Sequence, residues 1–169
     1  TVRNVTAGNS SVRFTGTTST FTGIECASIG GASGAVTIDS NTVRDINVYQ
    51  SLTTTSTSTT TGIVSSGSVV SQPLNIRRNI VRDITTSSAS IFATLLGISI
   101  TGTSDAYNCS DNTIFNLNCA HSTAANVNKA ISISSNGAGT SVVTRNLLYN
   151  TALASSSVTA QHQGIFMNN

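Results

Sequence analysis

The sequence predicts an all-β protein, a right-handed parallel β-helix of about four to five coils with 33–38 residues each. Three observations predict this fold. The composition suits strands and turns, two sequence motifs recur with the same period, and apolar residues alternate with polar ones inside each motif. We treat residues 1–169 as one β-helix segment.

The composition favours short strands joined by many turns. Of the 169 residues, 27 are Thr, 27 are Ser and 17 are Asn, whereas only 8% are charged, against about 25% in most soluble domains. The formal net charge of +2 offers no surplus for a phosphate backbone, so we expect no nucleic-acid partner. No apolar run is long enough to span a bilayer, so we expect no membrane span either.

One motif is led by asparagine. It reads NTVRDI at 41–46, NIVRDI at 79–84, NTIFNL at 112–117 and NLLYNT at 146–151, with spacings of 38, 33 and 34 residues. We place residues 1–5 in the same register, as a copy that lacks its asparagine. This placement puts Val2 in one column with Val43, and Val5 in one column with Ile46.

A second motif interleaves with the first. Gly-Ile occurs at 23–24, 62–63, 97–98 and 164–165, and Ala-Ile takes its place at 130–131, so the spacings are 39, 35, 33 and 34 residues. Apolar residues also stand three positions before each motif asparagine. Like residues at fixed phase predict parallel coils about 4.8 Å apart, with a right-handed sense by the rule for parallel crossovers. Leu52 to Thr61 and Ser87 to Leu96 then form a third face or a protruding turn.

The leading asparagines form a predicted structural ladder. Asparagine tolerates the left-handed conformation of a sharp corner, and stacked amides can bond to one another along the axis. We therefore expect a structural role, without a ligand, for the column of Asn41, Asn79, Asn112 and Asn146.

These two motifs together resemble the parallel β-helix repeats of secreted surface proteins and polysaccharide-active, pectate-lyase-like proteins. The closest likeness is to large secreted proteins of Bacteroidetes-type bacteria, and it covers essentially the whole chain. The resemblance implies a secreted or cell-surface location and a β-helical fold. It says little about function, because such repeats serve as adhesins, stalks and enzymes alike.

Two pairs of residues are weak candidates for a ligand site. Asp45 and Asp83 occupy equivalent positions in adjacent coils, roughly 5 Å apart, which would suit a retaining carboxylate pair. Each has an arginine neighbour, so a solvated charge ladder is the favoured interpretation. Phe115 and Tyr149 share an outward column and would be able to stack on a sugar ring. We assign no catalytic residue.

Other reactive residues lack a pattern. The three cysteines fall in inward columns, which favours core packing over zinc or a disulfide. Lys129, the only lysine, has no acidic cluster beside it, and neither His121 nor His162 has a carboxylate at a fixed spacing. We therefore expect no metal and no cofactor. The threonine run at 53–61 does not recur in other coils, which favours a local solvated loop over an ice-binding array.

Both ends of the chain lack a polar cap. The chain starts one residue into a motif copy and stops inside a Gly-Ile strand, so we expect a piece of a longer solenoid, with flanking coils or stacked copies as partners. The expected function is a non-enzymatic structural or adhesive segment. The alternative is polysaccharide binding or degradation, and ice binding is a remote third.

Overall fold

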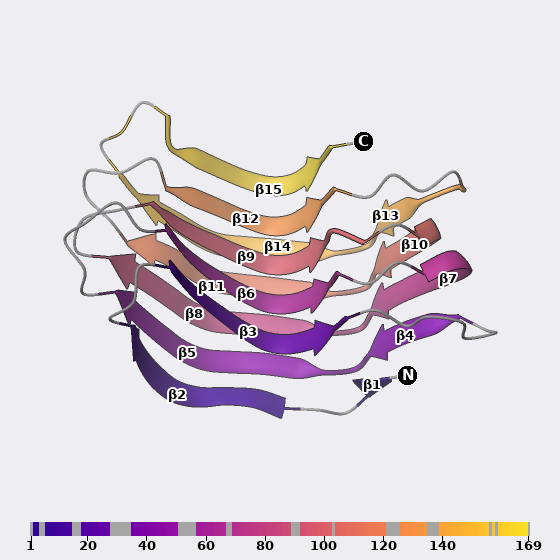
Figure 1. The fold of residues 1–169 in the computed structure, drawn as a ribbon, viewed down its shortest axis with the longest axis horizontal. Coiled ribbons are helices and arrows are strands. Elements are labelled where there is room, and N and C mark those ends of the chain that lie inside the picture. The colour runs from indigo at the N-terminus through magenta and orange to yellow at the C-terminus, as the bar shows by residue number, and fades with distance from the viewer. Residues whose placement is uncertain are drawn as a thin grey trace.

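The computed structural model describes residues 2–3, 6–14, 18–27, 35–50, 57–66, 69–88, 92–102, 104–120, 126–134, 139–155, 157 and 159–168. These residues form fifteen β-strands, and no helix occurs among them. The strands build three parallel sheets of five strands, and each coil gives one strand to each sheet (Figure 1). The predicted all-β parallel β-helix is therefore confirmed, with five coils stacked. Its right-handed sense stays a prediction.

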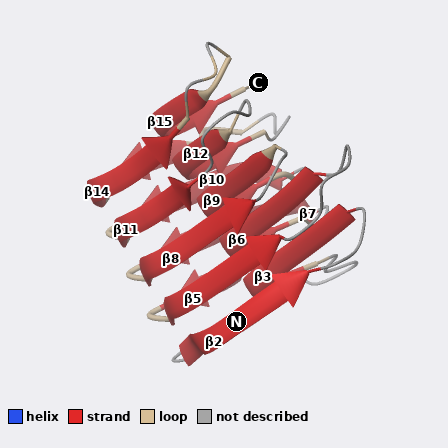
Figure 2. Cartoon of the chain, turned by 90° about the vertical axis from the view of Figure 1, so that its left-hand side faces the viewer, coloured by secondary structure: helices blue, strands red, loops and turns tan. Residues whose placement is uncertain are grey.

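The three sheets form the three faces of the solenoid, and Figure 2 shows the strands of one face lying side by side. Sheet A contains β1 (Val2–Arg3), β4 (Val36–Asp39), β7 (Val69–Arg77), β10 (Ser104–Ser110) and β13 (Val142–Thr144). Sheet B contains β2 (Thr6–Phe14), β5 (Thr42–Gln50), β8 (Ile80–Ser88), β11 (Thr113–Ala120) and β14 (Leu147–Ala154). Sheet C contains β3 (Thr18–Cys26), β6 (Thr57–Ser65), β9 (Ala93–Ile100), β12 (Val127–Ile133) and β15 (Gln161–Met167).

The core consists of the inward columns. In sheet B, Val43 pairs with Val81, Val81 with Ile114, and Ile114 with Leu148. The first three of these side chains are fully buried, and Leu148 packs against them. The isoleucines of sheet C align in the same way, from Ile24 to Ile165. Each coil therefore buries its apolar residues against the coils on either side, as expected for a solenoid.

The predicted register of residues 1–5 is wrong. Val2 pairs with Ile38 in sheet A, and Ala7, not Val2, pairs with Val43 in sheet B. The likeness between residues 1–5 and 42–46 spans five residues, whereas β2 and β5 pair along nine-residue strands. Because the side-chain pattern along a whole strand and the turns at its ends set the register, a likeness over five residues does not fix it.

The threonine run was expected to be a solvated loop, and its described part is not. Thr57–Ser65 forms β6 on the third face, and the side chains of Ser58 and Thr60 are fully buried inside the solenoid. They share inward columns with Ala93 and Leu95 of β9. Residues 51–56 lie outside the described residues. The third-face alternative is thus confirmed for β6 and β9.

In sheet C, three glycines pack closely against the coil that follows their own. A Cβ atom built on Gly23, Gly62 or Gly97 would lie 2.5–2.7 Å from the carbonyl oxygen of the equivalent residue in the next coil. It would also lie 2.6–2.9 Å from an inward side chain of sheet B. Gly23, Gly62 and Gly97 therefore stand where sheet C packs this closely on the following coil, and Ala130 takes the same place in the fourth coil.

Candidate functional site

The four motif asparagines form a column of hydrogen-bonded amides between sheets A and B. Asn79 is fully buried, and its Oδ1 accepts bonds from the backbone N and the Nδ2 of Asn41, both at 3.0 Å. Its own Nδ2 donates to the carbonyl oxygen of Ile38 and to Asn112 Oδ1, both at 3.0 Å. Asn112 repeats this pattern with Asn146. The carboxamide of Asn79 thus uses both donors and two acceptor positions, which leaves it no capacity for a ligand.

The left-handed residue at this corner is not the asparagine, so that part of the expectation is wrong. Positive φ angles of 52–59° occur at the residue just before each asparagine: Ser40, Arg78, Asp111 and Arg145. Arg78 takes this conformation although a bulky side chain disfavours it, so the surrounding corner holds it there. A second set with φ angles of 49–55° bends sheet B at Asp45, Asp83, Asn116 and Asn150.

Charges alternate in sign along the corner between sheets A and B. Asp39, fully buried, accepts a bond from Arg78 Nε at 2.8 Å and makes a second contact with Arg78 Nη2. Two coils on, Arg145 binds Asp111 through both Nε and Nη2, at 2.6 and 2.8 Å. The hydrogen bond from Arg78 holds the pKa of Asp39 at about 2, although burial opposes this shift. Opposite charges in successive coils avoid the repulsion that a column of like charges would carry.

Asp45 and Asp83, the candidate carboxylate pair, each form an ion pair with an arginine. Arg44 contacts Asp45, and Arg82 contacts Asp83. The Nη1 of Arg82 also lies 3.9 Å from the Oδ1 of Asp45. Asn116 donates a 2.6 Å hydrogen bond to the Oδ1 of Asp83. Arginine side chains occupy both carboxylates, so this geometry suits a charge ladder.

The second candidate pair forms an aromatic stack. The rings of Phe115 and Tyr149 lie face to face, with centroids 4.7 Å apart and planes 6° apart. Stacking of this kind occupies one face of each ring, and sugars also bind to aromatic faces. The side chain of Tyr149 remains 45% exposed, so its other face is the open part of the stack.

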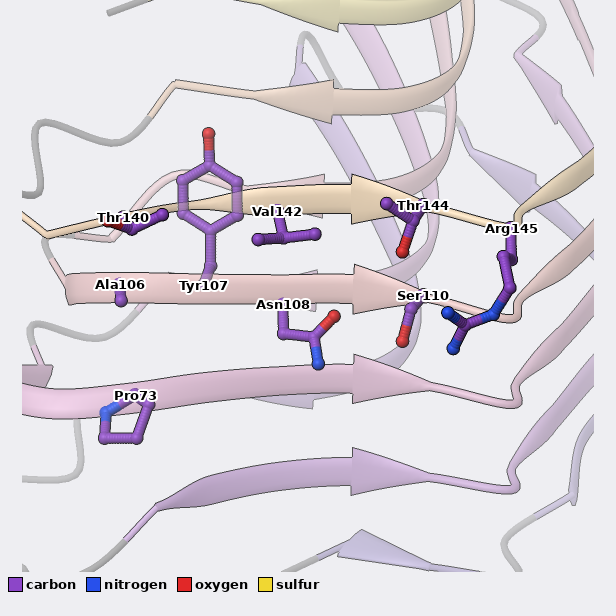
Figure 3. A pocket seen from close by; sticks show the side chains of 9 residues that line it. All are labelled: Pro73, Ala106, Tyr107, Asn108, Ser110, Thr140, Val142, Thr144 and Arg145. Carbon is purple, nitrogen blue, oxygen red and sulfur yellow. The ribbon is translucent and has the colours of Figure 1, made fainter.

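A groove on the outside of sheet A was not predicted. It encloses about 370 Å³ and crosses three successive coils through β7, β10 and β13 (Figure 3). Hydroxyl and amide groups line it together with apolar surface, and Arg145 lies at one end. Its lining residues are Pro73, Ala106, Tyr107, Asn108, Ser110, Thr140, Val142, Thr144 and Arg145.

The remaining reactive side chains do not converge. The ammonium of Lys129 lies 3.2 Å above the ring of Phe166, and burial lowers its pKa. His162 shares a 2.8 Å hydrogen bond with Thr151, and His121 lies outside the described residues. Among the described residues, no three His, Cys, Asp or Glu side chains gather as metal ligands would.

All three cysteines are free. Cys109 and Cys119 are fully buried, and Cys26 is half-buried against the core. Burial raises the pKa of both Cys109 and Cys119 to about 12. Since the thiolate is the nucleophile and the metal ligand, these two thiols serve as core residues.

Comparison with known proteins adds no relative: no family model, curated protein or solved structure matches this chain. In the described part of the chain, no helix is long and apolar enough to cross a membrane.

Proposed function

We propose that this chain is a non-enzymatic structural or adhesive β-helical segment of a secreted or cell-surface protein. The observation that supports the proposal most directly is the pairing of the candidate acids. Asp39, Asp45, Asp83 and Asp111 each contact an arginine, so these carboxylates are engaged in separate ion pairs instead of converging on one site. The motif resemblance to secreted Bacteroidetes-type and pectate-lyase-like repeats supports the location.

The test is a turnover assay on polysaccharides. Purified protein is incubated with polygalacturonate and a panel of neutral polysaccharides, and both reducing ends and unsaturated products are measured. We expect no turnover. Turnover that is lost in both Asp45→Asn and Asp83→Asn, with the fold intact by circular dichroism, would overturn the proposal in favour of a hydrolase.

A second candidate function is glycan binding, and the groove on sheet A favours it. A volume of about 370 Å³ lies in the range of small-molecule sites, and side-chain hydroxyls and an amide beside Val142 and Pro73 offer both polar and apolar contacts. The aromatic stack is the competing location. In this candidate function, a polyhydroxylated ligand lies along the groove beside Asn108.

A glycan array with two variants separates these locations. A hit that Asn108→Ala abolishes and Tyr149→Ala leaves unchanged assigns the groove. The reverse result assigns the aromatic stack. No hit at any glycan, or hits that neither variant changes, would contradict glycan binding at either place.

A further inference from the structure

Three hydroxyl groups are buried inside the solenoid, between the end of the sheet B strands and the start of the sheet C strands. They belong to Ser58 and Thr60 of β6 and to Thr86 of β8. Ser58 is 1% exposed, and the other two residues are fully buried. Within the described ranges, no hydrogen-bond partner is present for Ser58 Oγ, Thr60 Oγ1 or Thr86 Oγ1. Because folded proteins rarely leave buried hydroxyls without a partner, this cluster points to a bound group.

The register places the three hydroxyls in one part of the interior. One coil further on, the Sγ of Cys119 lies 3.6 Å from the carbonyl oxygen of Ala93. Thr86 pairs with Cys119, and Ser58 pairs with Ala93. Thr86 therefore stands beside Ser58 as Cys119 stands beside Ala93, and the strands β6 and β8 are in contact. Thr60 follows Ser58 on the same inward side, about 6.6 Å further along the strand.

The column that contains Thr60 leaves space beside this cluster. Thr60 stands between Phe21 of the first coil and Leu95 of the third, and its side chain is shorter than either. Ser58 is followed in its own column by Ala93, which is also small. Short side chains between longer ones leave room that close packing fills elsewhere in the core.

The fourth coil shows how a longer side chain satisfies the same region. Asn128 stands two coils after Thr60 in the same inward column. Its Nδ2 donates to the carbonyl oxygens of Leu117 and Ala152, at 3.2 and 2.6 Å. The asparagine amide thus reaches the backbone of sheet B directly. The hydroxyl of a threonine ends sooner, so in the second and third coils a further group has to bridge this distance.

We infer that ordered water is bound inside the solenoid between Ser58, Thr60 and Thr86. Water fits because it is small enough for a closed core, and it both donates to and accepts from hydroxyl groups. A buried water typically makes two to four hydrogen bonds, and three hydroxyls supply that number. The inference stands apart from the proposed function, since it concerns the interior and not the lateral faces.

High-resolution crystallography of the unaltered chain is the direct test. Water oxygens are expected within about 3.2 Å of at least two of the three hydroxyl oxygens. A dry interior at this position overturns the inference.

Urea unfolding gives an independent test. Thr60→Val and Thr86→Val keep the shape of the side chain and remove its hydroxyl. If the hydroxyls bind water, each variant is expected to lower the urea midpoint, whereas valine in place of an unsatisfied hydroxyl raises it. Because the two hydroxyls share one hydration site, the double variant is expected to lose less than the sum of the two single losses.

The matched control is Thr59→Val, because Thr59 lies half-buried on the outward side of β6. Its urea midpoint is expected to stay close to that of the unaltered chain. The inference fails if Thr60→Val or Thr86→Val raises the midpoint, if neither lowers it more than Thr59→Val does, or if the losses simply add. Circular dichroism checks that each variant folds.

Discussion

Replacing Asn79 with alanine tests the amide column most directly. The substitution removes four hydrogen bonds, two to Asn41, one to Ile38 and one to Asn112, all at 3.0 Å and all buried. At about 1 kcal/mol net for each bond, the expected loss in the free energy of unfolding is about 4 kcal/mol. Since domains of this size are stable by about 5–15 kcal/mol, the variant is expected to lose a large share of its stability.

The assay is urea unfolding, followed by circular dichroism and by tyrosine fluorescence. Two probes are needed because a solenoid can unfold coil by coil. Asn118→Ala is the matched control, because Asn118 lies half-buried on the outward side of β11. Asn79→Asp is expected to cost at least as much as Asn79→Ala, because a carboxylate oxygen would then face the carbonyl oxygen of Ile38. A loss below about 1 kcal/mol for Asn79→Ala, or an equal loss for Asn118→Ala, would refute the reasoning.

Three further predictions follow from packing and charge. Gly97→Ala places a Cβ 2.5 Å from a carbonyl oxygen and is expected to destabilise the fold by about 3 kcal/mol in the same urea assay; an unchanged midpoint contradicts the close packing. The ordinary pKa of Asp39 is 3.8 and the bond from Arg78 lowers it to about 2, so stability is fully present above about pH 4 and falls as the pH drops towards 2. Urea midpoints against pH are expected to show this decline, and Asp39→Asn to flatten it. With a pKa of about 12, Cys109 and Cys119 are expected to react with a disulfide reagent at pH 8 only after unfolding, and fast labelling of the folded chain would contradict their burial.

The columns were predictable because the same kind of residue recurs at each position. Ile38, Ile76 and Cys109 stand at one phase and are all fully buried, because close packing between stacked coils favours apolar side chains of similar size at such a position. The first coil was placed wrongly because its motif copies are poor. Ala7 stands where Val43 stands in the next coil, so similarity alone could not fix the register.

The corner and the groove were harder to predict for physical reasons. Asp39 and Arg78 hold different phases of the repeat, so their bidentate contact appears only once the corner is built. The groove lies beside a register shift between β7 and β10, where Ser104 pairs with Val69 but Ala106 pairs with Pro73. Two strands of unequal length break the periodicity from which the other columns were predicted.

The dependence of each coil on the coil that follows it gives folding a direction. The backbone N of Asn41 donates to Oδ1 of Asn79, a residue that is made 38 residues later. The ribosome releases a chain from its N-terminus, and each new coil therefore arrives in time to complete the one before it. At the growing end, the newest coil is the one left with unsatisfied donors and uncovered apolar side chains. The surface at risk of aggregation at the growing end thus stays one coil in size, however many coils have already folded.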